Sequence, residues 1–373
     1  MSCLKITRFV VWLATAVLVA SCSGGADVEA PDALGAYAVG HTTFTAVDAA
    51  RDDRALPVDV WYPVDEADAA TEPRTEYPLQ PPLTLPSEVA VDDLKVSSEG
   101  ARVFLVFSHG YGGINTQSTQ LMEALASHGF IIASPAHTGN TALDTSDDPA
   151  AAAEKRVPDV SFIIDTMFER ANTPGDAFVG RIDESKVGVL GHSFGGSTAL
   201  GMVAGWAGAE VDPRVKAIGV IAGGVGSDNF SEEVLAPVTA PTVLLVGTLD
   251  DTGAFENHRY VFGQMPNAEA LFKVEVTDAN HTHFANVCDI GNRLIELGLG
   301  PDSWPDIGAQ ALLEPYNDTC TEDVFPIAEA HRLQNLYMVA HFKRYLLGQT
   351  EYDAYLNAAY ADANEPAVSF EAQ

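Results

Sequence analysis

The most restrictive feature of the sequence is a regular alternation, from residue 102 onward, of short apolar segments with amphipathic segments. Segments that are apolar on both faces are typical of strands inside a parallel sheet, and helical periods between them indicate covering helices. The apolar segments are "RVFLVFS" (102–108), "FIIASP" (130–135), "KVGVLG" (186–191), "VKAIGVIAG" (215–223), "PTVLLVG" (241–247) and "LFKVEVT" (271–277). The helical patterns span 119–129, 157–171, 195–208 and 327–348. The sequence therefore predicts an α/β fold, with a mostly parallel sheet flanked by helices on both faces.

The flanking segments indicate the extent of the domain. Residues 37–47 and 56–63 are rich in β-branched and aromatic residues, which predicts two further strands. Residues 64–100 are Pro-rich and acidic and have no helical period, so we expect a long surface excursion there. The sequence contains no internal repeat and no second domain boundary. We expect one domain at residues 35–356, followed by a C-terminal tail at residues 357–373.

The N-terminus predicts export from the cytoplasm. Lys5 and Arg8 precede an apolar run at residues 9–20, and small residues follow, which is the pattern of a signal peptide over residues 1–21. The apolar run is too short to span a bilayer. Its end, "VASC", resembles the lipobox of bacterial lipoproteins, which implies that Cys22 becomes the lipidated N-terminus. An ordinary signal peptide with an incidental cysteine is the alternative.

The residues after Cys22 support the lipoprotein interpretation. The segment "SGGADVEAPDA" is small and polar, so residues 22–34 are expected to form a flexible tether. In such families a serine directly after the cysteine, here Ser23, usually accompanies sorting to the outer membrane. We therefore expect an exported protein, anchored by lipid at the bacterial cell envelope.

Charge and cysteine content narrow the possible partners. The chain has 52 acidic and 20 basic residues, a formal net charge of −32, which repels nucleic acid and bare anionic membrane. We therefore expect no nucleic acid partner and membrane contact only through the lipid at Cys22. Cys288 and Cys320 are the two cysteines beyond the signal region, and in an oxidising compartment they are expected to form one disulfide.

A glycine-rich motif, "GHSFGG" (191–196), lies between a predicted strand and a predicted helix. This is the context of the G-x-S-x-G turn that presents a nucleophilic serine above a sheet. Gly191 and Gly195 permit a tight turn, which places Ser193 at its tip. A plain glycine-rich turn would explain the glycines but not the surrounding strand and helix. The motif therefore predicts Ser193 as a nucleophile.

An acyl-transferring serine needs hydrogen-bond donors for the oxyanion of its tetrahedral intermediate. One expected donor is the backbone amide of Phe194, which follows the nucleophile at a helix N-terminus. The second is the amide of Tyr111 in "SHGYGG" (108–113), directly after a predicted strand. The Tyr111 ring is also a candidate to contact the acyl group.

The acid and the base are expected after the two following strands, in the order serine, acid, histidine. "TLDD" after residue 247 offers Asp250 as the acid, with Asp251 facing water or capping the next helix. "NHTHFAN" (280–286) offers His281 and His283 as the base, and spacing alone does not decide between them. A zinc site at this histidine pair lacks the further Cys or His ligands that it would need.

Taken together, these motifs resemble a known group of enzymes. From about residue 35 to 356 the chain is similar to secreted α/β-hydrolases of the dienelactone-hydrolase-like group, near platelet-activating-factor acetylhydrolases and bacterial polyester hydrolases. The matching segments are "HGYGG", "PAHTGNT", "DVSFIID", "GHSFGGSTAL", "GTLDD", "HTHFANVC" and "YLLGQTEYDAYL". Dienelactone hydrolases proper use a cysteine nucleophile, whereas this chain has Ser193, so the resemblance indicates relatedness rather than substrate.

The resemblance also bears on the choice of histidine. These families carry the catalytic histidine three residues before a phenylalanine, which implies His281, ahead of Phe284. His283 would then line the cleft or point to solvent. The spacing in polyester hydrolases can be shorter, which keeps His283 as the alternative base.

The surroundings of the site are less strongly determined. Only residues 224–240 lie between two predicted strands where this fold usually carries its lid, so we expect no large lid domain. His137 and Asn140 in "PAHTGNT" follow a strand at the same sheet edge and are candidates for one cleft wall, although a self-satisfied turn is equally consistent. Residues 285–325 are a candidate for the other wall.

These observations predict a serine hydrolase that cleaves carboxylic esters through an acyl-enzyme, acting on short-chain or accessible bulky and polymeric esters. The mechanism requires neither metal nor organic cofactor. A serine peptidase of the same fold is one alternative, and a surface binding lipoprotein with a degenerate site is another. The sequence specifies neither the physiological ester nor the oligomeric state.

Overall fold

The protein is described here by a computed structural model that covers residues 28–80 and 83–373. The predicted signal peptide, Cys22 and the first part of the predicted tether lie outside these residues.

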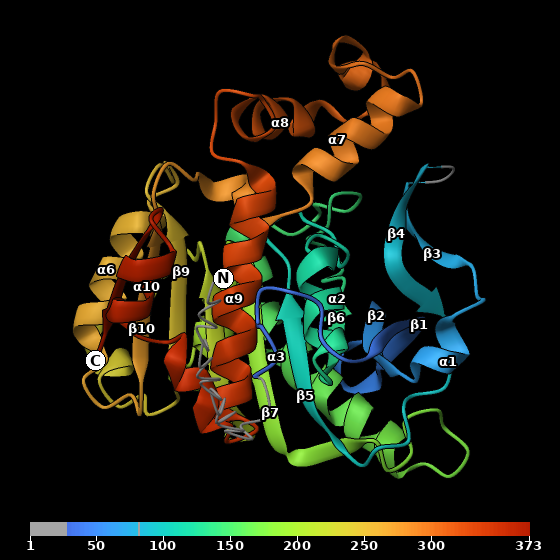
Figure 1. The fold of residues 1–373 in the computed structure, drawn as a ribbon, viewed down its shortest axis with the longest axis horizontal. Helices are drawn as coiled ribbons and strands as arrows, with labels where there is room; N and C mark the ends of the chain where they lie inside the picture. The colour runs from blue at the N-terminus through green and yellow to red at the C-terminus, as the bar shows by residue number, and fades with distance from the viewer. Residues whose placement is uncertain (1–27, 81–82) are drawn as a thin grey trace, which may run out of the picture.

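The described residues form one sheet of 11 strands in the order β11-β10-β9-β8-β7-β5-β6-β2-β1-β4-β3 (Figure 1). The six central strands β6, β5, β7, β8, β9 and β10 run parallel to one another. At the two ends of this parallel block, β2 pairs antiparallel with β6 and β11 pairs antiparallel with β10. The strands are β1 (Ala38–Asp48), β2 (Arg54–Val64), β3 (Arg74–Gln80), β4 (Leu83–Asp92), β5 (Arg102–Ser108), β6 (Ile131–Pro135), β7 (Ile182–His192), β8 (Val215–Ile221), β9 (Thr242–Gly247), β10 (Leu271–Val276) and β11 (Val368–Ala372). The mostly parallel sheet of the α/β-hydrolase prediction is confirmed.

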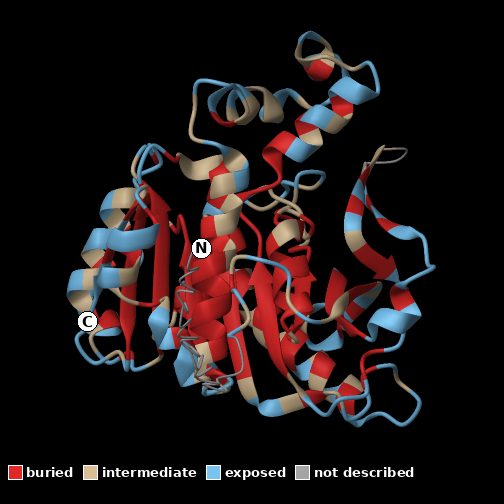
Figure 2. Cartoon of the chain, viewed as in Figure 1, coloured by how far each residue is buried: buried red, intermediate tan, exposed pale blue. Residues whose placement is uncertain are grey.

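Helices cover both faces of the sheet. One face packs against α2 and α9 and the other against α3 and α4, each through its own apolar cluster. The helices are α1 (Glu66–Ala69), α2 (Thr119–Ser127), α3 (Pro149–Asn172), α4 (Phe194–Ala204), α5 (Glu232–Leu235), α6 (Ala254–Gln264), α7 (Val287–Glu296), α8 (Leu313–Thr319), α9 (Ile327–Tyr345) and α10 (Ala358–Asn364), with 3₁₀ turns at Ala49–Arg51, His281–Phe284, Pro301–Ile307, Gln310–Leu312 and Thr350–Ala354. Figure 2 shows the central strands buried between these layers. The two-sided covering explains why the strands are apolar throughout.

Helix α3 begins at Pro149, eight residues before the predicted start at 157. Two further segments differ from the prediction in kind. Residues 64–100 contain the hairpin β3–β4 rather than an irregular excursion, and β4 extends the sheet by pairing with β1. Residues 357–373 are not a tail, because they form α10 and β11, and β11 pairs with β10. Val368 and Phe370 are buried while Ser369 is exposed, so this last strand follows the two-residue period of a half-buried edge.

The described end of the predicted tether is attached to the domain. Glu29 accepts hydrogen bonds from Nδ1 of His128 (2.9 Å) and from Nζ of Lys343 (2.5 Å). Asp32 pairs with Arg332 at 2.9 Å. Residues 28–34 therefore belong to the folded unit, and no helix among the described residues is long and apolar enough to span a membrane.

Candidate active site

Ser193 lies on a strained turn between β7 and α4. Its φ of 58° and ψ of −121° place a non-glycine residue in a region that L-amino acids rarely adopt. The turn is tight because glycine flanks it: a Cβ on Gly195 would overlap the carbonyl oxygen of Ser108, and one on Gly191 would overlap that of Gly195. The sequence therefore folds locally so that Ser193 stands at the C-terminal edge of the sheet and at the N-terminus of α4.

The loop after β5 lies directly beside Ser193, because β5 and β7 are parallel neighbours. A Cβ built on Gly110 would lie 3.3 Å from Cβ of Ser193. Within residues 28–80 and 83–373, the amide hydrogens of Tyr111 and Phe194 have no hydrogen-bond acceptor. Both predicted oxyanion donors therefore remain available to a ligand.

The Tyr111 side chain is placed at the surface of this loop and is 42% exposed. Its hydroxyl donates to the carbonyl of Asp147 at 2.9 Å, and its ring packs edge-on against that of Phe194 with 5.6 Å between centroids. The ring is thus held beside the nucleophile turn and is partly exposed, and its contact with the acyl group stays a prediction.

Asp250 and His281 come together because β9 and β10 are adjacent parallel strands. The Nδ1–H of His281 donates to Oδ2 of Asp250 at 2.7 Å, and the Asp250 side chain is fully buried. The other carboxylate oxygen accepts from the backbone amide of Thr252 (3.0 Å) and from its hydroxyl (2.6 Å). Burial opposes ionisation of Asp250, but the bonds from His281 and Thr252 outweigh it and lower the pKa of this carboxyl.

The bond to Asp250 occupies Nδ1 of His281 and leaves Nε2 for proton exchange. His281 lies next to the nucleophile turn, since its ring centroid is 4.8 Å from that of His192, the residue before Ser193. In the described part of the chain, neither Nε2 of His281 nor Oγ of Ser193 has a hydrogen-bond partner within 3.5 Å. Such a contact is often long without substrate and shortens in the complex.

A hydrogen-bonded chain that sequence reasoning missed connects the three loops of the site. Gly110 donates its amide hydrogen to Oε1 of Gln117 at 3.0 Å, and Nε2 of Gln117 donates to Nδ1 of His192 at 2.7 Å. His192 in turn donates from Nε2 to the carbonyl of His281 at 2.9 Å. Burial lowers the pKa of His192 to about 3, so its ring is neutral, as this series of hydrogen bonds requires. Gln117 lies outside any motif, and His192 occupies a variable position of the G-x-S-x-G motif, so the sequence does not reveal this role for either residue.

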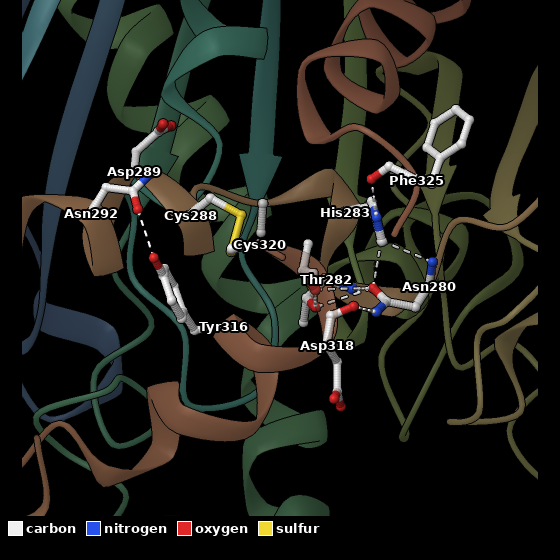
Figure 3. The surroundings of a disulfide bond; sticks show 12 residues. Asn280, Thr282, His283, Cys288, Asp289, Asn292, Tyr316, Asp318, Cys320 and Phe325 are labelled. Atoms are coloured by element: carbon white, nitrogen blue, oxygen red, sulfur yellow. Dashed lines mark hydrogen bonds between the residues drawn. A yellow bond between two sulfur atoms is a disulfide. The ribbon is translucent and has the colours of Figure 1, made fainter. Parts of the chain in front are cut away.

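His283 occupies a different environment from His281. It is only 1% exposed, its Nε2–H donates to the carbonyl of Phe325 at 2.9 Å, and its Nδ1 accepts from the amide of Asn280 at 2.9 Å (Figure 3). Burial lowers its pKa. His283 therefore neither lines a cleft nor faces solvent, because both ring nitrogens hold the backbone of this loop. Among residues 28–80 and 83–373, His281 has a carboxylate partner and His283 has none.

His137 and Asn140, which were expected in a cleft wall, are instead buried beneath the nucleophile loop at 1% exposure each. His137 accepts from Oγ of Ser108 at 3.0 Å and donates from Nδ1 to Asp159 at 2.9 Å. Asn140 accepts a hydrogen bond from Arg156. Both residues form internal hydrogen bonds because the loop after β6 turns inward over α3, so the cleft-wall expectation is wrong.

The predicted disulfide between Cys288 and Cys320 is present and joins the start of α7 to the end of α8 (Figure 3). Beside it, the carbonyl of Asp318 accepts from the side chain of Asn280 at 2.9 Å, and the hydroxyls of Thr319 and Thr282 lie 2.5 Å apart. The end of α8 is therefore bonded to the loop that carries His281. Figure 1 shows α7 and α8 projecting beyond the sheet on this side.

Comparison with known proteins places this arrangement in a family. The family model described as PET hydrolase-like matches residues 96–296 of the 373, more than half of the chain. The chain belongs to the PET hydrolase-like family. The matched region contains the nucleophile turn, the loop after β5, and the Asp250 and His281 loops.

Individual relatives agree with this membership. Cutinase 1 from Thermobifida cellulosilytica is 29% identical over 192 residues, covering 51% of this chain and 63% of the relative. Cutinase from Thermobifida fusca (strain YX) is also 29% identical over 192 residues, covering 51% of this chain and 55% of the relative. The aligned part thus spans less than two thirds of these relatives. The structure of a ferulic acid esterase from Streptomyces cinnamoneus matches with a TM-score of 0.61 over 90% of this chain and 96% of that one, at 22% identity, which supports the fold.

Among the described residues, no group of three or more His, Cys, Asp or Glu side chains is arranged to bind a metal ion.

Proposed function

We propose that this protein is a serine hydrolase that cleaves carboxylic esters through an acyl-enzyme intermediate. The observation that carries the proposal is the coincidence, at one sheet edge, of the strained Ser193, the Asp250–His281 pair at 2.7 Å and the backbone amides of Tyr111 and Phe194, which have no acceptor among the described residues. Each part has a separate task in acyl transfer. A binding protein would have no use for the complete set.

In the acylation half, His281 accepts the proton of the Ser193 hydroxyl at Nε2 while the serine oxygen attacks the ester carbonyl. The developing oxyanion accepts hydrogen bonds from the amides of Tyr111 and Phe194. Asp250 stays ionised and stabilises the imidazolium through its bond to Nδ1. When the tetrahedral intermediate collapses, His281 donates its proton to the departing alcohol oxygen and the acyl group remains on Ser193.

In the deacylation half, water takes the place of the alcohol. His281 removes one proton from the water as it attacks the acyl carbon, and the same two amides hold the second oxyanion. Collapse returns the proton to Ser193 and releases the carboxylic acid. All steps are carried by residues of this chain, without a redox change or an added cofactor.

The substrate class is proposed from the family and from the surface around Ser193. The matched relatives are named as PET hydrolases, cutinases and a ferulic acid esterase, all of which act on esters. Tyr111, Leu143 and Leu249 are exposed apolar side chains on loops at this sheet edge. Residues 224–240 contain only the short helix α5, which leaves no lid at its usual position. We therefore propose short-chain or sterically accessible bulky esters.

The test is fluorophosphonate labelling of Ser193 together with the kcat/KM of p-nitrophenyl butyrate and of the matched amide, N-butyryl p-nitroaniline. We expect labelling of the wild type, none of Ser193→Ala, and much faster turnover of the ester. Faster turnover of the amide would indicate a serine peptidase. Absence of labelling would indicate a binding protein.

We also propose that the protein is exported and held at the bacterial envelope by lipid on Cys22. The support is the sequence "VASC" after an apolar run, together with a disulfide between Cys288 and Cys320, the two cysteines beyond the signal region. Metabolic labelling with a radioactive fatty acid should mark the wild type and not Cys22→Ala. Equal labelling of both would reject the anchor.

A further inference from the structure

A fully buried arginine lies behind the nucleophile loop. Arg156, on α3, is 0% exposed, and its two terminal nitrogens contact the loop after β5. Nη2 donates to the carbonyl of Gly110 at 3.0 Å, while Nη1 donates to the carbonyl of His109 and to Oγ of Ser108, the latter at 3.1 Å. Burying a guanidinium is unfavourable unless it is well paired. Its position at the site therefore requires an explanation.

The contacts determine the direction of the loop amides. In a planar trans peptide the C=O and the following N–H point in opposite directions. The carbonyl of Gly110 points inward to Arg156, and it also accepts from Gly113 (3.1 Å) and from Nδ1 of His109 (2.7 Å). The amide of the same peptide unit belongs to Tyr111 and must therefore point away from Arg156, where it has no acceptor among the described residues.

The preceding peptide shows the same opposition between its C=O and its N–H. The carbonyl of His109 also points to Arg156, and its amide partner, the N–H of Gly110, points the other way to Gln117. Arg156 thus fixes two successive peptide planes by the fork of its guanidinium. The same guanidinium lies over the Phe194 ring, 5.1 Å from its centroid.

We propose that Arg156 is a positioning residue for the oxyanion site, which aims the Tyr111 amide and adds a buried positive charge behind it. The inference rests on the proposed ester hydrolysis. A charge in a water-excluded environment acts more strongly than the same charge in water, so this cation favours the negative oxygen that develops at Ser193.

The surroundings of Arg156 maintain the cation in place. Asn140 accepts from Nη2, and the nearby Asp159 supplies negative charge that also pairs with Arg54 (2.7 Å) and His137 (2.9 Å). Burial lowers the pKa of Arg156 to about 9, which is still above neutral pH, so the side chain remains charged. The segments "PAHTGNT" and "RVPD" therefore support the site from behind rather than line it.

The experiment compares the full chain with Arg156→Met, Arg156→Lys and a control, Arg170→Met. Arg170 lies on the same helix and pairs with Asp176 at 2.9 Å, but it has no contact with the nucleophile loop. For each protein we would measure the melting temperature, kcat and KM for p-nitrophenyl butyrate, and the Ki of phenylboronic acid, whose tetrahedral adduct with a serine resembles the intermediate.

We expect Arg156→Met to lower kcat by about 10²-fold with little change in KM, comparable to the loss of one oxyanion donor. The Ki for phenylboronic acid should rise with the loss of kcat. Arg156→Lys retains the charge but lacks the two terminal guanidinium nitrogens that bind the two carbonyls at once, so about a tenfold loss of kcat is expected. Arg170→Met should lose stability while kcat stays within about twofold of the wild type.

If Arg156→Met fails to fold, the lysine variant decides the question. Folded Arg156→Lys with wild-type kcat and Ki would overturn the proposal, as would an Arg156→Met that lowers only the melting temperature, as the control does. These outcomes leave the proposed function intact, because the wild type remains active. An inactive wild type that is not labelled by a fluorophosphonate would overturn both.

Discussion

At the scale of single residues, the candidate site depends on backbone approaches that only glycine permits and on hydrogen bonds that fix each polar side chain. A glycine motif, strand ends and chain order predict Ser193 and Asp250 as site residues, whereas His281 was preferred to His283 only through the family resemblance. Arg156 and Thr252 were not predictable, since a lone arginine in an amphipathic helix and a lone threonine after an aspartate carry no sequence pattern. His137 was misplaced because the sequence does not reveal whether a loop turns inward or outward.

The nucleophile turn should not tolerate a side chain at residue 195. Gly195→Ala would force a Cβ into the carbonyl oxygen of Ser108, so we expect a loss of more than about 3 kcal/mol of unfolding free energy and loss of activity. Gly263→Ala in α6 is the control, because a Cβ there meets nothing within 4 Å, and it should be neutral or slightly stabilising. Urea denaturation measures both, and equal stability of the two variants would contradict the account.

Asp250 should act through the tautomer of His281. Asp250→Asn keeps the shape of the side chain but removes its charge and the oxygen that accepts from Nδ1 of His281. The kcat is therefore expected to fall by about 10⁴-fold with little change in KM. The neighbouring Asp251 is exposed, and Asp251→Asn should stay near the wild type. Steady-state kinetics with p-nitrophenyl butyrate make the comparison. A loss of less than about tenfold in Asp250→Asn would rule out its assigned role.

At the scale of secondary-structure elements, the strands with continuous apolar runs were predicted close to their true bounds. Helix α3 was predicted to begin at residue 157 but begins at Pro149, because the helix continues through Pro158, a residue that usually marks a helix start. The hairpin β3–β4 was missed because Pro78 and Pro86 interrupt its pattern and its register is irregular. Strand β11 was missed because a five-residue segment at a sheet edge gives only a brief alternation. Neither segment is apolar enough for its sequence alone to predict a strand.

The disulfide should stabilise both the fold and the loop of the base. It closes a segment of 32 residues, so Cys288→Ser/Cys320→Ser should lose about 3–4 kcal/mol of unfolding free energy. The kcat should fall as well, because Asp318 and Thr319 hold Asn280 and Thr282. Reductant should reproduce both effects in the wild type and have none in the variant. Unchanged kcat in the folded variant would show that α8 does not position His281.

The outer strands contain a pH-dependent contact. His41 on β1 bonds to Asp59 on β2 at 2.7 Å and to Asp92 on β4 at 2.8 Å. Burial lowers the pKa of His41, but the bonds and charges of the two carboxylates outweigh it and raise the pKa above 6.5. Protonated His41 therefore contributes its full share of the unfolding free energy below about pH 6.5, the pKa of an unfolded histidine. This contribution is lost as the pH rises through the higher pKa that His41 has in the folded protein.

We accordingly expect the difference in unfolding free energy between the wild type and His41→Gln to be larger at pH 6 than at pH 9. Urea denaturation at the two values measures it. The matched control is His258→Gln, since burial lowers the pKa of His258 to about 3. The difference in unfolding free energy between the wild type and His258→Gln should not decrease from pH 6 to pH 9. A difference for His41 that stays constant with pH would contradict the assigned charge.

At the scale of the whole molecule, the net charge of −32 dominates. Self-repulsion of such a surface opposes folding, and salt screens it over a Debye length of about 8–10 Å. Raising NaCl from 50 to 500 mM should therefore increase the melting temperature by a few degrees. Equal ionic strength from a different monovalent salt should act similarly, and a fall in melting temperature would contradict the prediction.

The central claim concerns the division of roles between the two neighbouring histidines. The most direct measurement is the rate of p-nitrophenyl butyrate hydrolysis by the full chain, by His281→Ala and by His283→Ala, each checked for folding. His281→Ala should lose about 10³-fold or more in kcat, whereas folded His283→Ala should remain within about tenfold of the wild type. Loss of activity in His283→Ala with His281→Ala still active, or an inactive wild type, would contradict the account.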